Sequence, residues 1–142
     1  MTVLDTIGGT RLLPLQHLVS EKRARVLIKL ECENVAVEPE ESAVLSGRPS
    51  GSHKIEGTGA GFVVPLWSDD LADEIQTVST EEAMATARLL AGQEGIFAGT
   101  STGANVAAAF RVAERLGTGH TVVTVAVDSG MKYLSTALYA HS

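Results

Sequence analysis

The chain has 142 residues, enough for one domain with a sizeable core, and its formal net charge of −6 disfavours non-specific binding to nucleic acid, because phosphate repels an acidic surface. The single cysteine, Cys32, excludes an intramolecular disulfide and a cysteine-based zinc site. Residues 1–9 lack the pattern of a secretory signal, and no apolar run approaches membrane-spanning length. We therefore expect a cytoplasmic protein with neither a nucleic-acid nor a membrane partner.

The first half of the chain predicts two strands and a long loop. Residues 25–30 (RVLIKL) are aliphatic and β-branched, which is typical of a strand, and residues 35–37 (VAV) form a second short apolar run before a proline. Residues 40–65 are rich in glycine, proline and serine and have little periodicity, which favours a long functional loop or linker. Four apolar residues predict that this loop packs down: Ile55, Phe62, Val63 and Val64.

The second half predicts two helices and a strand. Residues 79–82 (STEE) form a capping box, and the helix after it ends near Gly95. Its apolar face carries Ala83, Met84, Ala87, Leu90 and Ala91. A second helix is predicted from about residue 102 to 116, and residues 121–127 (TVVTVAV) predict a central strand covered on both faces. Residues 131–139 favour a last short helix, and this order of elements predicts an α/β fold.

A glycine-containing stretch, residues 99–105 (GTSTGAN), lies between an apolar run and the second helix. Glycines let a backbone approach a ligand closely, and the helix start presents free N–H groups. Such a stretch alone is more often a plain strand-to-helix turn than a binding site. The four histidines are scattered without a second ligand at metal spacing, so no metal site is predicted.

Several motifs together resemble the cysteine synthase / cystathionine β-synthase family of pyridoxal-phosphate enzymes, which have fold type II (tryptophan-synthase-β-like). In chain order, the motifs are IGGT (7–10) with 12–15, RVLIKLECE (25–33), VEP (37–39), LSG (45–47), HKI (53–55), GTGAGF (57–62), GTSTGA (99–104), and DSG (128–130) with YLST (133–136). The resemblance implies the reduced large domain of that architecture, with a central, mostly parallel sheet flanked by helices. Residues 1–34 match the family's N-terminus and residues 35–142 its C-terminal part, as a single domain without the small mobile domain.

The resemblance also implies roles for individual residues. Ser101 would hydrogen-bond the pyridine nitrogen of pyridoxal 5'-phosphate, and Asp128 and Ser129 would flank the cofactor. The substrate entrance would be lined by Gly57, Thr58 and Gly59. The chemistry implied is β-replacement or β-elimination on an O-activated serine in cysteine biosynthesis, with a small amino acid as substrate. In some relatives the same cleft accepts the C-terminal tail of serine acetyltransferase.

One departure from the family bears on activity. The family's strand leads into N-P-T-G-S-x-K-D-R, whose lysine forms the Schiff base, whereas here Glu33-Asn34 is followed directly by Val35. The substrate loop T-S-G-N-T-G and the phosphate loop G-T-G-G-T are missing as well, so the chain resembles a member with an internal deletion. The other lysines do not sit in that motif: Lys22, Lys29, Lys54 and Lys132.

We therefore expect no catalytic residue and no activity from this chain alone. One alternative is a non-catalytic remnant that binds a peptide tail or a full-length paralogue, and another is a truncated product without a function of its own. An exposed apolar patch and an unpaired strand edge, left where the missing elements would pack, predict self-association, as a homodimer or a larger species.

Overall fold

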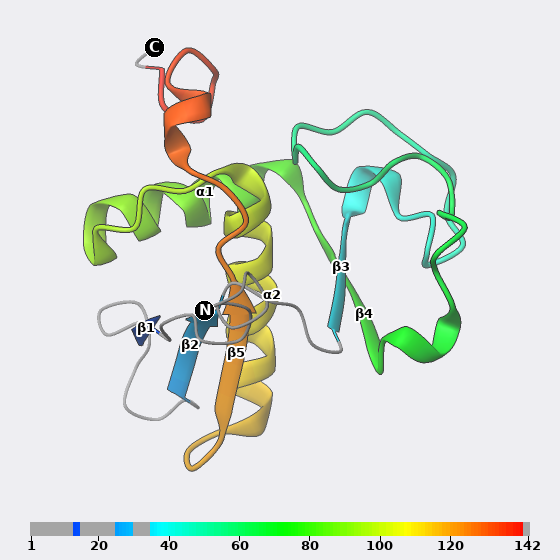
Figure 1. Cartoon of the computed structure of the whole chain (residues 1–142), viewed down its shortest axis with the longest axis horizontal. Helices are drawn as coiled ribbons and strands as arrows, with labels where there is room; N and C mark the ends of the chain where they lie inside the picture. Colours follow the sequence, from blue (N-terminus) through cyan, green and yellow to red (C-terminus); the bar gives the residue numbers. More distant parts are fainter. Residues whose placement is uncertain (1–12, 15–24, 30–34, 141–142) are drawn as a thin grey trace, which may run out of the picture.

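The strands form two small sheets, each containing one parallel pair, and two longer helices lie beside them (Figure 1). The computed structural model describes residues 13–14, 25–29 and 35–140. The helices and strands are β1 (Leu13–Pro14), β2 (Arg25–Lys29), β3 (Val35–Pro39), β4 (Glu74–Val78), α1 (Thr80–Leu89), α2 (Thr100–Leu116) and β5 (Thr121–Val125). Shorter turns are η2 (Glu40–Ser42), η3 (Asp69–Leu71), the π-helical η4 (Leu90–Glu94) and η5 (Gly130–Tyr133). The predicted motif at 7–10, Lys22, Cys32 and the junction at 33–34 lie outside the described residues.

The first sheet has the order β1-β2-β5, in which β2 and β5 are parallel and β1 is antiparallel to β2. The second pairs β3 with β4 in parallel, with Val35 opposite Glu74. The predicted α/β fold with mostly parallel strands and flanking helices is confirmed, and the parallel pairs fall in two separate sheets. No helix in the described part of the chain is long and apolar enough to cross a membrane.

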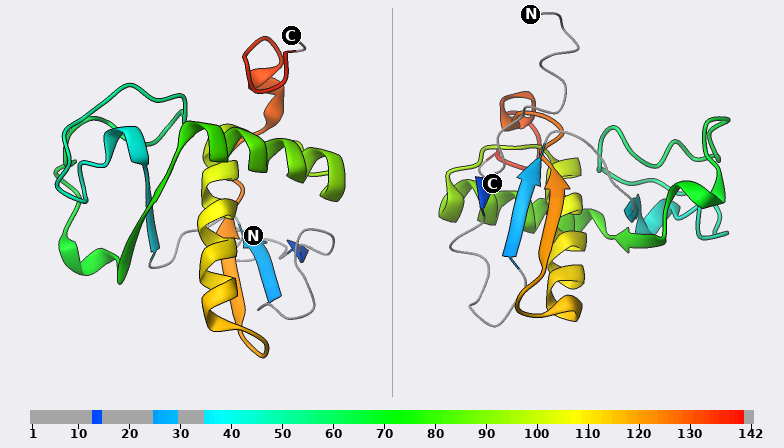
Figure 2. Two further views of the ribbon diagram at one scale, coloured as in Figure 1. Left: turned by 180° about the vertical axis from the view of Figure 1, so that it is seen from behind. Right: turned by 60° about the horizontal axis from the view of Figure 1, so that its bottom comes forward.

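The core lies between α1, α2 and the strands. One cluster packs Leu90 against Val106, Ala109 and Ala113, with Val122 of β5 alongside. Figure 2 shows α1 crossing the first turns of α2, while α2 runs along β5. The alanine-rich start of α2 is buried, as its lack of early charge predicts.

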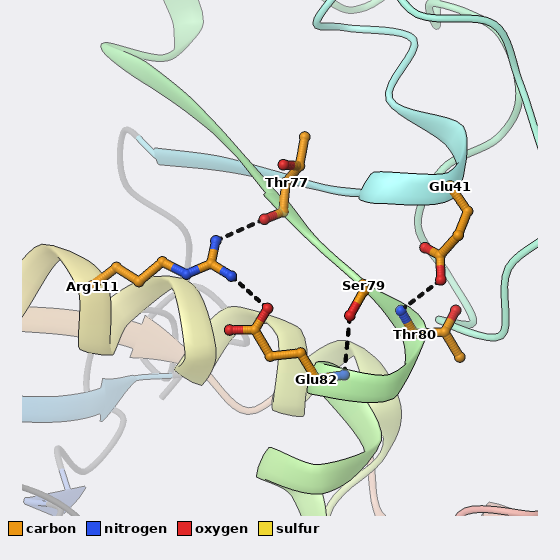
Figure 3. Close-up of polar contacts among 6 residues, drawn as sticks. All are labelled: Glu41, Thr77, Ser79, Thr80, Glu82 and Arg111. Carbon is orange, nitrogen blue, oxygen red and sulfur yellow. Dashed lines mark hydrogen bonds and ion pairs between the residues drawn. The ribbon is translucent and has the colours of Figure 1, made fainter.

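The start of α1 is fixed by contacts from three elements (Figure 3). The Ser79 hydroxyl accepts the Glu82 amide at 3.2 Å, which confirms the predicted N-cap, and Glu41 of η2 accepts the Thr80 amide at 2.8 Å. The Glu82 carboxylate contacts Arg111 of α2, and this guanidinium also donates to the Thr77 carbonyl at 2.7 Å. These bonds tie β4, α1 and α2 together at one corner of the fold.

Two predictions about the C-terminal third are wrong. Among the described strands β5 pairs only with β2, and Val123 is 43% exposed, so β5 is not covered on both faces. Its inward residues pack on α2, and no described layer covers the other face. The predicted helix at 131–139 is only the single turn η5. The Thr136 hydroxyl donates to the Tyr133 carbonyl at 2.8 Å and accepts the Leu138 amide at 3.3 Å, and such local bonds compete with a helix.

Part of the long loop is anchored in the core. Ile55 is buried against Val78 and Ala83, as predicted. The other three apolar residues that were predicted to pack down are exposed: Phe62, Val63 and Val64. The prediction that they join the core is therefore wrong, since the loop turns them outward beyond the glycines at 57–61.

Candidate functional site

Two glycines allow close contacts at the start of α2. A Cβ at Gly99 would lie 2.3 Å from Asp128 Oδ1 and 2.5 Å from a ring carbon of Tyr133. A Cβ at Gly103 would lie 2.0 Å from the Ala83 carbonyl oxygen of α1. The absence of a side chain at Gly99 thus allows the turn after β5 to pack against the start of α2. The absence of a side chain at Gly103 allows α1 and α2 to approach each other closely.

The turn after β5 places a carboxylate beside the start of α2. The Tyr133 hydroxyl donates to Asp128 Oδ2 at 2.7 Å, and the Lys132 ammonium lies 3.7 Å from the same oxygen. Burial, reinforced by the bond to Asp128, raises the pKa of the Tyr133 phenol, which therefore stays protonated and donating at neutral pH. Asp128 Oδ1 is buried and has no hydrogen-bond partner within the described residues.

A small pocket of about 250 Å³ opens at this point. We call it the small pocket; its lining residues are Glu56, Gly57, Ser101, Val127, Asp128, Lys132 and Tyr133. Three of the predicted site residues, Ser101, Gly57 and Asp128, therefore meet on one surface although they are far apart in the sequence. Ser101 comes from the first turn of α2, where it is almost fully buried.

The other predicted site residues lie elsewhere. Ser129 is exposed and does not line the small pocket; its hydroxyl accepts the Met131 amide at 3.3 Å and so caps η5. Thr58 and Gly59 line a larger pocket, and Gly57 borders both pockets. The Thr58 hydroxyl donates to the Ile55 carbonyl at 3.0 Å, which shapes the loop rather than leaving that group free.

The large pocket has a volume of about 550 Å³ and a mainly apolar lining. Its lining residues are Val37, Glu38, Val44, Leu45, Gly57, Thr58, Gly59, Ala60, Phe62, Val64 and Trp67. Glu38 is only 3% exposed, yet its carboxylate accepts the Leu45 amide at 2.8 Å, the Ser46 amide at 2.9 Å and the Ser46 hydroxyl at 2.5 Å. These three donors compensate for the burial of the charge and hold one wall of the pocket in place.

Sequence reasoning did not single out Glu38, Tyr133 or Trp67. A signal for Glu38 exists, because a carboxylate in an otherwise apolar strand needs donors, and the LSG turn begins seven residues later. Tyr133 follows Asp128 by five residues, which is compatible with a bond across one turn. Nothing in the sequence marks Trp67 as a pocket residue.

Comparison with known proteins gives a consistent match. Residues 32–128 match the family model described as pyridoxal-phosphate dependent enzyme. Over 108 residues the chain is 48% identical to cysteine synthases of Staphylococcus aureus strains Mu50 and N315, covering 76% of this chain and 35% of each relative. The chain thus spans about a third of the length of the curated relatives it matches.

Solved structures agree. The chain superposes on cysteine synthase from Entamoeba histolytica with a TM-score of 0.74 at 40% identity, covering 80% of this chain and 34% of that one. Superposition on O-ureido-L-serine synthase gives a TM-score of 0.70 at 39% identity, covering 77% of this chain and 34% of that chain. Superposition on the O-acetylserine dependent cystathionine beta-synthase from Helicobacter pylori gives a TM-score of 0.70 at 38% identity. It covers 76% of this chain and 35% of that chain.

Proposed function

Since the chain belongs to the pyridoxal-phosphate dependent enzyme family, we propose that it is a cysteine-synthase-like chain that does not catalyse β-replacement by itself. It retains the ring-nitrogen end of a cofactor site and part of a substrate entrance. The observation that carries the proposal is the small pocket, where Ser101 meets two carboxylates, and where the lysine in the lining, Lys132, lies 3.7 Å from Asp128 Oδ2 and is 68% exposed. The cysteine synthases among its relatives support cysteine biosynthesis as the setting.

The described residues fit only part of pyridoxal phosphate, which when bound supplies an electron sink for amino-acid chemistry. The Ser101 hydroxyl is suited to a hydrogen bond with the ring nitrogen. The charged neighbours Glu56 and Asp128 would repel a phosphate group, and Lys132 is 68% exposed and 3.7 Å from Asp128 Oδ2. A lysine that forms a Schiff base needs a desolvated, positioned amine. The described residues therefore do not fit the phosphate and aldehyde ends of the cofactor, and we derive no reaction step from them.

We attribute this partial fit to an internal deletion at residues 34–35. In this proposal residues 1–34 and 35–142 are the two retained parts of the family's large domain, and the small mobile domain is lost. Asp128 and Ser129 flank the ring end of the former site, with Ser129 contributing through the turn it caps. Gly57, Thr58 and Gly59 are the remainder of the surface that receives a small amino-acid substrate.

The test is an absorbance and activity measurement on the purified chain. With added pyridoxal 5'-phosphate we expect no aldimine band and no cysteine from O-acetylserine and sulfide above a protein-free control. A full-length cysteine synthase in the same assay shows that the conditions support turnover. Activity from this chain that disappears in Lys132→Ala would refute the proposal and identify the amine.

A second candidate function is peptide binding in the large pocket. The observation favouring it is the apolar lining of about 550 Å³ next to the glycines at 57–59. The proposed ligand is the C-terminal tail of a serine acetyltransferase, and a full-length paralogue is the other proposed partner. Titration of the fluorescence of Trp67, the single tryptophan, with a synthetic tail peptide measures binding directly.

Two variants make this titration specific. Phe62→Ser removes an apolar group from the pocket lining and should weaken binding, whereas Leu71→Ser changes an exposed residue that does not line the pocket. Both side chains are more than half exposed, so neither change should unfold the chain. No response at high micromolar peptide would remove this candidate.

A further inference from the structure

The ring of His53 is bonded through both of its nitrogens. The Ile55 amide donates to Nδ1 at 3.3 Å, and Nε2 lies 3.1 Å from the Gly59 carbonyl oxygen. An amide can only donate and a carbonyl can only accept, so Nδ1 carries the lone pair and Nε2 the hydrogen. Only the neutral ring satisfies both contacts, because a second proton would place two donors face to face at Nδ1.

The bond from Nε2 reaches a neighbouring segment that is rich in glycine. Residues 57–61, which we call the glycine loop, contain three glycines in the left-handed region, with φ of 80° at Gly57, 57° at Gly59 and 81° at Gly61. A Cβ at Gly59 would lie 2.7 Å from His53 Nε2 and 2.7 Å from Pro39 Cγ. The imidazole therefore packs directly onto the loop, and glycine is what allows the contact.

The position of His53 links two parts of the surface. Its ring lines the grooves on the α1 side of the loop, while the glycine loop itself lines the large pocket on the other side. The titratable and charged side chains that line the same grooves are Glu41, Lys54, Glu56, Glu81, Arg88 and Tyr133. Side chains of both charge signs therefore line the grooves that His53 lines.

We propose that His53 is the positioning residue of the glycine loop, and that protonation of its imidazole releases the Ile55 amide and loosens the wall of the large pocket. This inference rests on the second candidate function for its biological meaning, because the loop is part of the surface proposed to receive the peptide tail. The pocket is therefore ordered while the ring is neutral and loosened once the ring is protonated, a change that acidification tests.

The test uses two substitutions that each preserve one of the two bonds. His53→Asn places an amide oxygen near Nδ1, where it still accepts from Ile55, and His53→Gln places an amide N–H near Nε2, where it still donates to Gly59. Neither variant titrates in this range. His120→Gln is the matched control, since His120 is exposed and does not line these pockets.

Emission from Trp67, which lines the large pocket, is recorded from pH 8 to pH 5 without ligand. We expect a red shift on acidification in the wild-type chain and in His120→Gln, and no pH-dependent shift in His53→Asn or His53→Gln, because neither replacement side chain titrates in this range. At pH 8 the Ile55 amide should exchange with solvent roughly fivefold faster in His53→Gln than in His53→Asn, the value of one neutral hydrogen bond.

A wild-type spectrum that does not change with pH, a shift that persists in His53→Asn, or equal protection of the Ile55 amide in the two variants would overturn the inference. These measurements need neither peptide nor cofactor. Failure of the tail peptide to bind would therefore count against the second candidate function alone.

Discussion

The contact between α1 and α2 at Gly103 gives a sharp test of the packing argument. In Gly103→Ala the new Cβ would lie 2.0 Å from the Ala83 carbonyl oxygen and 3.0 Å from the Ala87 amide nitrogen. Real Cβ atoms essentially never approach another atom more closely than 3.0 Å, so the Cβ and the Ala83 oxygen must move apart by at least about 1 Å. Both partners are helix backbone and cannot rotate away, so one helix must move.

That movement opens the alanine cluster around Ala83, Ala104 and Ala108. Overpacking of this kind costs about 1–3 kcal/mol, and at the backbone-to-backbone contact the upper part of that range applies. Alanine regains about 1 kcal/mol through its higher helix propensity. We therefore expect Gly103→Ala to lower the free energy of unfolding by about 2 kcal/mol.

Urea denaturation followed by circular dichroism measures this change. Gly92→Ala is the matched control, because its Cβ would meet no atom within 4 Å and Gly92 does not have a positive φ. It should be neutral or stabilising by up to about 1 kcal/mol. A Gly103→Ala chain as stable as Gly92→Ala would refute the idea that this glycine sets the distance between the helices.

Three further predictions concern charge and surface. Tyr133→Phe leaves Asp128 Oδ2 without its 2.7 Å donor and should cost about 1–3 kcal/mol at pH 7. Because burial raises the pKa of Tyr133 in the folded chain, wild-type stability should fall as pH rises above about 10, and the fall should be shallower in Tyr133→Phe, as urea titrations at pH 8 and pH 11 can show. The hydrogen bond from Arg115 lowers the pKa of Glu74, so the stability it contributes should be lost as pH falls below about 4.5, and Glu74→Gln should lose less stability over that range in acid denaturation. Val123→Lys on the open face of β5 should reduce self-association in sedimentation; a wild-type chain that sediments as a stable monomer would contradict the expected exposed patch.

Local signals predicted α1 and α2 well. The capping box marked the start of α1, and the Ser79 hydroxyl does accept the Glu82 amide. The lack of early charge in α2 predicted its burial. These features depend on residues three or four positions apart, so the information lies within one turn of the chain.

Features that depend on distant partners were missed. Whether both faces of β5 are covered depends on which other elements pack against it. Its apolar sequence alone does not reveal those elements. Glu38 is stable in the core because the amides of Leu45 and Ser46 reach it, and the strand sequence does not reveal those donors. The second glycine of the GTSTGAN stretch faces α1 rather than a ligand. The cofactor and substrate roles of the predicted site residues stay predictions.

The buried carboxylate of Glu38 has a consequence for where the chain tolerates change. The Glu38 carboxylate accepts three hydrogen bonds from residues 45 and 46, and these bonds close the segment 38–46 into a ring. The turn after η2 is held in this way although it contains no helix or strand of useful length. Insertions or protease cuts between 39 and 46 would open that ring and uncover the charge. Residues 66–70 are held by local bonds alone, such as the bond from the Leu71 amide to the Ser68 carbonyl, and Leu66 is 90% exposed. Limited digestion should therefore begin there, and a reporter peptide inserted at that tip should leave the rest of the fold intact.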